Sequence, residues 1–172
     1  MIARFVTAKR GFQQIESSIF AFPGVETGGL LPGRVIGGAL VAPFTIPGGP
    51  KAVRARARFS PDVEYQQALL DHAYENFGCT FVGAWHRHPG HFDSPSAVDH
   101  ATARHIVTDA GWDLVQAVFP IAIVRDGEVC VRAYLMHRDA PDFREIPFKV
   151  VPDDDPLILE ALGGPTASAR EE

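Results

Sequence analysis

The sequence predicts an α/β (α+β) domain in which a mixed central β-sheet is flanked by helices. Segments with the period-2 pattern of strands, or with short apolar runs, alternate with segments of helical period along the 172 residues. Glycine and proline separate these segments, and Asp126-Gly127 is a strong signal for a hairpin turn. Because strands and helices alternate, we expect one sheet with helices packed against it.

The first part of the chain is predicted to form a strand, a helix and a pair of strands. Residues 2–7 are expected to be the first strand, and residues 11–22 an amphipathic helix. The apolar side chains of this helix recur at helical spacing: Phe12, Ile15, Ile19 and Phe22. Residues 30–46 are rich in Val, Ile and Leu, and a turn at Gly37-Gly38 divides them into two strands.

The middle of the chain is predicted to hold an alternating strand, a helix and a buried strand. Arginines alternate with apolar residues over 53–59, which predicts a strand with one apolar and one basic face. A cap residue, a proline and an acid at 60–62 begin a helix that runs to about Phe77. The apolar run at 80–85 indicates a buried strand that leads directly into His86.

The last part of the chain is predicted to contain a helix and several strands. A loop over residues 87–95 precedes a helix from Ser96 to about residue 110. Three further strand regions follow: residues 114–124, 128–137 and 143–151. We therefore expect one catalytic domain over 1–151. Residues 152–172 are expected to be a loosely ordered tail, in which residues 157–162 alternatively dock as a short helix.

Composition argues against several classes of protein. Hydrophobic residues make up 46% of the chain and charged residues 22%, which are ordinary values for a globular protein. The formal net charge is -5 with no long basic block, so bulk nucleic-acid binding is not expected. No apolar run approaches the roughly 20 residues of a membrane helix, and the N-terminus does not have the charge order of a secretory signal. We therefore expect no membrane partner and a cytoplasmic location.

The two cysteines carry no recognisable chemistry. Cys79 and Cys130 lie far apart in the sequence and form no CxxC motif. We expect two reduced, buried thiols, although the sequence alone leaves a disulfide between them open.

The densest group of polar residues follows the buried strand. If the chain over 80–88 is extended, His86 and His88 point to the same side. The loop after them turns the chain back, and a helix that starts at Ser96 brings the carboxylate of Asp99 to the same point. Two imidazoles and one carboxylate are a ligand set for zinc that leaves the fourth position open.

An open position is characteristic of a catalytic zinc, which lowers the pKa of its water to about 7. Such a site needs a proton carrier, and we expect Glu26, in the turn before Gly28-Gly29, to have this role. Each piece alone has a simpler interpretation. The histidines would be ordinary strand residues, Ser96-x-x-Asp99 a helix cap, and the glutamate a surface acid. The combination is far more specific than its parts.

Together these residues resemble the JAMM signature of the MPN (JAB, Mov34/PAD-1) metalloprotease family. The signature is a Glu, then His-x-His, seven intervening residues and Ser-x-x-Asp, and five polar positions agree: Glu26, His86, His88, Ser96 and Asp99. The resemblance implies one Zn²⁺ per chain, bound by His86, His88 and Asp99. It also implies that Glu26 is the general acid/base and that Ser96 stabilises the oxyanion.

The resemblance further implies the cytidine-deaminase-like JAB/MPN fold and the bacterial single-domain type. Members of the family hydrolyse peptide or isopeptide bonds after the C-terminal glycine of ubiquitin, ubiquitin-like modifiers or bacterial sulfur-carrier relatives. A protein of this kind is therefore the expected substrate, and E1-like or E2-like pathway proteins are expected partners. The pathway is left open between phage defence and cysteine or cofactor synthesis.

Some residues depart from the family pattern or extend it. Arg87 stands where many relatives carry Ser or Thr, and we expect its side chain to point away from the metal, toward substrate or into packing. The extra His91 and Asp93 in the ligand loop are either bystanders or tune access. The alternating strand supplies further candidate substrate contacts: Arg54, Arg56 and Arg58. That basic strand is alternatively a solvated face.

Three rival functions remain at this stage. Two His and a carboxylate also form the facial triad of non-haem Fe(II) oxygenases, although Glu26 and Ser96 favour hydrolysis. Some MPN-like domains lack a metal and act as scaffolds, whereas all ligand positions are intact here. A zinc hydrolase of a small amide or a free peptide would use the same site.

Overall fold

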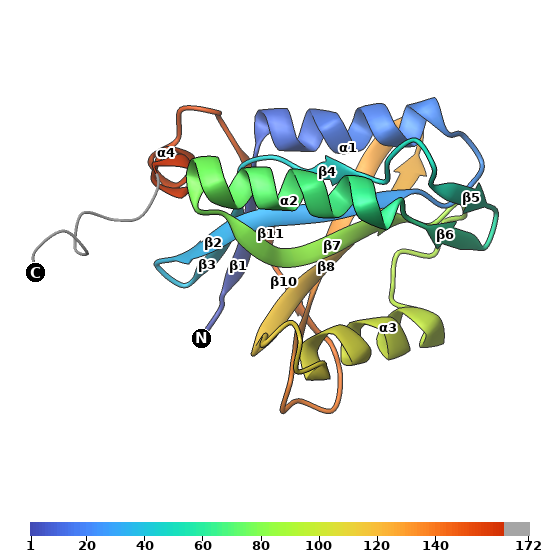
Figure 1. Cartoon of the computed structure of the whole chain (residues 1–172). Helices are drawn as coiled ribbons and strands as arrows, with labels where there is room; N and C mark the ends of the chain where they lie inside the picture. Colours follow the sequence, from blue (N-terminus) through green and yellow to red (C-terminus); the bar gives the residue numbers. More distant parts are fainter. Residues whose placement is uncertain (164–172) are drawn as a thin grey trace, which may run out of the picture.

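The structure is a computed structural model that describes residues 1–163, in which strands and helices build one layered domain (Figure 1). The elements are β1 (Arg4–Ala8), α1 (Lys9–Ala21), β2 (Gly28–Ile36), β3 (Ala39–Ala42), β4 (Ile46–Pro47), β5 (Val53–Ala55), β6 (Arg58–Ser60), α2 (Val63–Phe77), β7 (Thr80–Arg87), α3 (Ala97–Thr108), β8 (Gln116–Arg125), β9 (Glu128–His137), β10 (Arg144–Ile146), β11 (Phe148–Val151) and α4 (Pro156–Leu162).

The central sheet is mixed, which confirms the predicted fold class. Its strand order is β10-β9-β8-β7-β2-β3-β1-β11, and β4 pairs with β2 beside this path. The pairs β7–β8, β1–β3 and β1–β11 are parallel, and the other pairs are antiparallel. In the view of Figure 1, α1 lies at the top, α2 lies in front of β2 and β7, and α3 lies at the bottom. Leu70 of α2 packs against the same core cluster as Ala103 of α3, whereas α1 packs against a different cluster.

The two faces of the sheet are buried under different helices. Along β8, successive side chains alternate between the faces. Val118 and Ala122 belong to the core cluster that contains the buried α1 residues Ile15 and Ile19. Ala117 belongs instead to the cluster under α3. The residues of the site described below lie on the α3 face.

Two predicted elements closely match the structure, and one was wrong. The amphipathic helix is α1, and Gly37 and Gly38 form the predicted hairpin turn with φ of 52° and 76°. The predicted single strand over 53–59 is instead the β5–β6 hairpin, with its turn at residues 56–57. The alternating Arg pattern continues through this turn, so no glycine or proline marks it.

The chain continues to pack beyond residue 151. The short helix considered for residues 157–162 is present as α4, where the side chain of Asp155 caps the helix and Ile158 and Ala161 are buried. The expectation of a loosely ordered tail is therefore wrong for residues 152–163, because these apolar side chains pack against β1 and β3. The rest of that expectation, residues 164–172, lies outside the described residues.

The structure also bears on the two cysteines and on the expected absence of a membrane helix. Cys79 and Cys130 are both free thiols; Cys79 is buried and Cys130 is half-buried. Burial raises the pKa of the Cys79 thiol, which makes this thiol a poorer nucleophile. Within residues 1–163, no helix combines the length and the apolar character needed to span a membrane.

Candidate metal centre

The end of β7 presents two imidazoles to one point. The strand stays extended past its last assigned residue, because the amide of His88 donates to the carbonyl of Ala122 at 2.9 Å. His86 and His88, two positions apart, therefore lie on the same face, and their Nε2 atoms are 2.8 Å apart. This placement matches the expectation from the sequence.

The first turn of α3 supplies a carboxylate to the same point. Ser96 is the N-cap of α3, and its Oγ accepts from the amide of Asp99 at 3.2 Å. The Asp99 carboxylate accepts in return from the amide of Ser96 at 2.6 Å, which completes a capping box. The cap thus fixes the carboxylate, whose oxygens lie 2.9 Å from Nε2 of His86 and 3.2 Å from Nε2 of His88.

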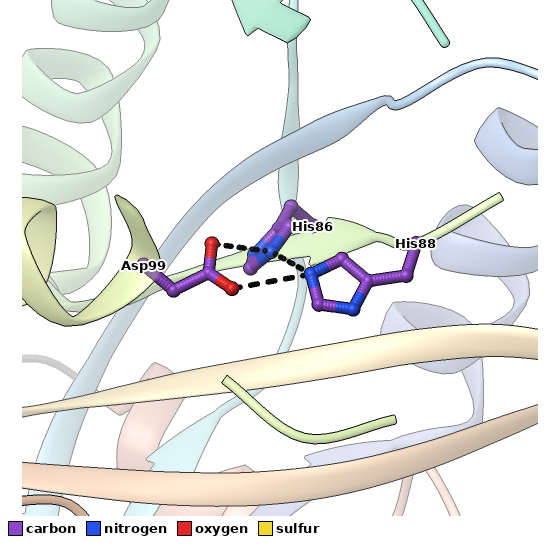
Figure 2. A group of neighbouring side chains, drawn as sticks. All are labelled: His86, His88 and Asp99. Atoms are coloured by element: carbon purple, nitrogen blue, oxygen red, sulfur yellow. Dashed lines mark hydrogen bonds and ion pairs between the residues drawn. The ribbon is translucent and has the colours of Figure 1, made fainter. Parts of the chain in front are cut away.

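The three side chains fit a metal ion. Figure 2 shows the two imidazoles and the carboxylate facing one another, and one ligand atom of each lies within 4.8 Å of the others. A tetrahedral zinc with bonds of about 2.0–2.1 Å holds its ligand atoms roughly 3.3 Å apart. The observed spacing of 2.8–3.2 Å is close to that value. Nδ1 of His88 lies 2.7 Å from the carbonyl of Phe92, so it donates there and leaves Nε2 for a metal.

The protonation of these side chains reflects the same contacts. Burial acts to raise the pKa of Asp99, but hydrogen bonds with His86 and His88 outweigh it and hold that pKa well below its usual range. The hydrogen bond with Asp99 raises the pKa of His88. Asp99 is therefore ionised at neutral pH, as a metal ligand requires.

Glu26 reaches this centre from the other side. Its amide donates to the carbonyl of Ala55 at 2.8 Å, and its side chain lines the same pocket as His86 and Asp99. Burial raises the pKa of Glu26, although the two histidines partly oppose the shift. A carboxyl with a raised pKa is suited to taking up and releasing a proton near neutral pH.

Two glycines let β2 approach the strands around it. A Cβ on Gly28 would lie 2.4 Å from the carbonyl oxygen of Trp85, and one on Gly29 would lie 2.2 Å from that of Ile46. Neither glycine has a positive φ, so close approach rather than unusual backbone angles explains the Gly-Gly pair. The pair brings the end of β2, and with it Glu26, against the strand that carries His86.

A pocket of about 350 Å³ opens beside the ligand side chains. It lies between α3, the sheet and the β5–β6 hairpin. Its polar side chains include Glu26, His86 and Asp99, and most of the others are apolar. The apolar lining includes Leu30, Phe59, Val98, Ile106, Phe119, Ile121 and Phe143. Such a concave, mostly apolar site with a few convergent polar groups is typical of a ligand pocket.

The four candidate arginines have different environments. Arg54 packs inward, with its guanidinium 3.7 Å from the centroid of the Phe22 ring and its Nε donating to Thr27 at 3.0 Å. Arg56 is exposed at the hairpin turn, and Arg58 is exposed and lines the pocket.

Arg87 points away from the ligand atoms, as expected. It is only 7% exposed and donates to the carbonyl of Phe22. Of the two alternatives for Arg87, its burial favours packing over contact with a substrate. His91, also noted in the sequence, is exposed in the loop.

The structure also brings in residues that the sequence did not single out. The carbonyl of Phe92 orients His88, and Asp93 contacts Arg132 and Tyr134 of β9. About 40 residues separate these partners, and no local pattern marks such a pair. Asp93 was noticeable only as an acid in the ligand loop.

Comparison with known protein families identifies a JAB domain in this chain. The family model for prokaryotic homologs of the JAB domain (Prok-JAB) matches residues 14–137, which is most of the chain and includes all five signature positions. The chain belongs to this family. The resemblance to JAMM/MPN proteins is thereby confirmed.

A curated relative is the "Probable metalloprotease y4qB" of Sinorhizobium fredii. It is 40% identical over 88 residues, which are 48% of this chain and 53% of the relative. This chain therefore matches only about half the length of that protein.

Two solved structures share the fold. Protein DSY2949 from Desulfitobacterium hafniense has a TM-score of 0.66 and 19% identity, with 86% of this chain and 93% of that chain covered. A protein from Salinibacter ruber has a TM-score of 0.57 and 24% identity, with 91% and 96% covered. At these identities the likeness concerns the fold alone.

Proposed function

We propose that this protein is a zinc-dependent peptidase or isopeptidase that hydrolyses the amide bond after the C-terminal glycine of a ubiquitin-like or sulfur-carrier-like protein. The observation that carries the proposal is the meeting of Glu26 with the ligand side chains of His86 and Asp99 in one pocket. Membership of the Prok-JAB family and the name of the Sinorhizobium relative support a metal-dependent hydrolase.

In this proposal His86, His88 and Asp99 hold one zinc ion per chain. When bound, zinc supplies a Lewis acid that polarises the scissile carbonyl and lowers the pKa of a water molecule. The same ligand set also suits Fe(II). The nearby carboxyl of Glu26 favours hydrolysis over oxygenation, because hydrolysis needs a group that carries a proton.

Two protein side chains have the other catalytic roles in this proposal: Glu26 transfers the proton and Ser96 stabilises the oxyanion. Glu26 takes the proton from the attacking water and delivers it to the leaving nitrogen, for which its raised pKa is suited. The Oγ of Ser96 accepts from the amide of Asp99, so its hydroxyl hydrogen remains to donate to the substrate. That hydrogen stabilises the negative charge that develops on the carbonyl oxygen.

An extended, glycine-ended tail fits the geometry of the β5–β6 hairpin. Within the described residues β6 pairs only with β5, so its other edge is available to a substrate strand. Ala57, Arg58 and Phe59 of this hairpin line the pocket. We therefore propose that the tail binds along β6, with Arg58 and Arg56 as charged contacts, and that E1-like or E2-like proteins act in the same pathway.

The apolar pocket favours one alternative, a zinc hydrolase of a small amide or peptide. A glycine tail has no side chain to fill about 350 Å³ of mostly apolar space. A substrate with a bulky apolar group beside the scissile amide would fill it, and would gain about 25 cal/mol for each Å² of apolar surface buried.

The deciding experiment compares cleavage of two kinds of substrate. One is a ubiquitin-like or sulfur-carrier protein with an extension after its last glycine, and the other is a set of short peptides with apolar side chains. Each is incubated with the zinc-loaded protein, with the chelated protein, with Glu26→Gln and with the exposed α2 control Glu75→Gln. We expect the zinc-loaded protein to cleave after the glycine, and we expect chelation to abolish this cleavage. Glu26→Gln should reduce it about 10²–10⁴-fold, whereas the control Glu75→Gln should leave it unchanged.

The other outcomes would redirect the assignment. Cleavage of apolar peptides but not of the carrier would support the small-substrate alternative. A chain that binds no metal would support a scaffold. Full activity of Glu26→Gln would contradict the proposed proton carrier. Charge reversal at Arg58 is expected to raise KM for the protein substrate but not for a short peptide.

A further inference from the structure

The loop between the second histidine and α3 has its own anchor. Residues 89–95 belong to no helix or strand, yet the carbonyl of Phe92 must stay 2.7 Å from Nδ1 of His88 for that hydrogen bond to persist. The side chain of Phe92 is 63% exposed and cannot hold the carbonyl in place by burial. The next residue, Asp93, supplies the fixed point.

Asp93 is held through both its side chain and its backbone. Its Oδ1 accepts from Nη1 of Arg132 at 2.9 Å, and its carbonyl accepts from the hydroxyl of Tyr134 at 2.8 Å. The two anchors act on different atoms of one residue, so together they restrict both its position and its orientation. The carbonyl of Phe92 lies one residue earlier and shares this restriction.

Arg132 is itself fixed by Glu145 on β10. Its Nε and Nη2 donate to the two carboxylate oxygens of Glu145 at 2.9 and 2.6 Å, a bidentate arrangement that leaves Nη1 pointing to Asp93. The ring of Tyr134 is only 6% exposed, which holds its hydroxyl in place. The anchor therefore rests on the sheet and not on another loop.

Strand register explains why β9 can reach the loop. His86 pairs with Ile121 of β8, and Ile121 pairs with Arg132 of β9. Residues that pair across neighbouring strands point to the same face of the sheet. Arg132 therefore lies on the same face as His86, two strands away, which is a distance of about 10 Å. Tyr134, two positions further along β9, is on the same face.

We propose that Arg132 and Tyr134 are positioning residues for the ligand His88. They hold Asp93, Asp93 fixes the carbonyl of Phe92, and that carbonyl keeps the imidazole oriented with Nε2 toward His86 and Asp99. The inference rests on the proposed function only in taking His88 as a metal ligand.

The expected consequence concerns metal affinity more than folding. Removing a group that orients a metal-binding histidine typically weakens metal binding or activity 10–100-fold. Arg132 and Asp93 have side chains that are 40% and 26% exposed, and ion pairs this exposed contribute little to the free energy of unfolding.

The test uses Arg132→Gln and Tyr134→Phe, with Arg4→Gln and Tyr74→Phe as matched controls. Arg4 is exposed on β1, at the other end of the sheet, and Tyr74 is exposed on α2. Three quantities are measured: the dissociation constant for Co²⁺ from its visible absorption, the NMR signal of the His88 Nδ1 proton in the metal-free protein, and the urea midpoint of that protein.

We expect Co²⁺ to bind about 10-fold more weakly to both test variants than to the controls. The Nδ1 proton signal should be lost or broadened, and the urea midpoint should stay within the range of the controls. A dissociation constant and a proton signal that match the controls would overturn the proposal. If the unmodified protein binds no Co²⁺, the proposed function fails instead, and the proton signal still decides whether Arg132 and Tyr134 orient His88.

Discussion

Glu26 and His88 approach the same centre, but the chain positions them by different means. On the β2 side, Glu26 precedes a strand whose register is set by buried backbone contacts and by the close approach of Gly28 and Gly29. On the β9 side, the loop that orients His88 is held by the partly exposed ion pair of Asp93 with Arg132 and by the hydroxyl of the buried Tyr134. The first arrangement leaves no room for an added side-chain atom at Gly28 or Gly29. The second has room in its loop but depends in part on the ion pair of Asp93 with Arg132.

The largest effect, on metal affinity, is expected at Asp99, whose carboxylate contacts both His86 and His88. Asp99→Asn keeps an oxygen that can cap α3 but removes the negative charge of the metal ligand. We expect zinc affinity, measured by competition with a coloured chelator, to fall by more than about 100-fold, the upper end of the range for groups that only support a ligand. Asp62→Asn is the control, because the Asp62 carboxylate also accepts from a backbone amide at a helix N-terminus, that of Tyr65 in α2, and lies outside the ligand set. Equal affinities in the two variants would exclude Asp99 as a ligand.

The next largest effect is expected when one methyl group is added to a glycine on each side of the centre. A Cβ on Gly29 would meet the backbone of Ile46 and the indole of Trp85, whereas a Cβ on Gly90, in the ligand loop, would meet nothing within 4 Å. Gly29→Ala is therefore expected to lower the free energy of unfolding by about 1–3 kcal/mol. Gly90→Ala should change it by less than about 1 kcal/mol in either direction. Urea titration of both variants measures the difference, and similar values would contradict the contrast.

Much of the candidate metal centre could be predicted from the sequence, because the determinants of its ligand side chains are local. The apolar run of β7 places His86 and His88 on one face, and the pattern Ser96-x-x-Asp99 encodes a cap. The agreement of residue types and spacing over five positions then linked Glu26 to the ligands, although 60 residues separate it from His86.

The β9 side could not be predicted, because it depends on strand order. Arg132 reaches Asp93 only because β7, β8 and β9 are neighbours in register, and periodicity does not determine which strands pair. The β5–β6 hairpin was missed for a related reason. Arg54 and Arg58 follow one alternating pattern, but the chain reverses between them, so Arg54 packs inward while Arg58 faces the pocket.

A smaller effect is expected where that hairpin supports Glu26. Arg54→Met removes the hydrogen bond to the buried Thr27 and the contact with Phe22. We expect a loss of about 1 kcal/mol in the free energy of unfolding and a kcat lowered severalfold with KM unchanged, because Glu26 loses support and the pocket stays intact. Arg56→Met, at the exposed turn, is the control. A raised KM with normal kcat would instead make Arg54 a substrate contact.

The smallest effect is expected from titration of the exposed anchor on the β9 side. The hydrogen bonds from Arg132 lower the pKa of Glu145 from its ordinary value of 4.5, so this carboxylate contributes stability that is fully present above that value. That contribution is lost as the pH falls through the lower folded value. The difference in free energy of unfolding between the unmodified protein and Glu145→Gln should therefore be larger at pH 7 than at pH 3. High salt should reduce it at pH 7, because salt screens exposed pairs. A difference that is independent of pH and salt would mean that Glu145 acts by packing, and the two sides of the centre would then be held by the same kind of force.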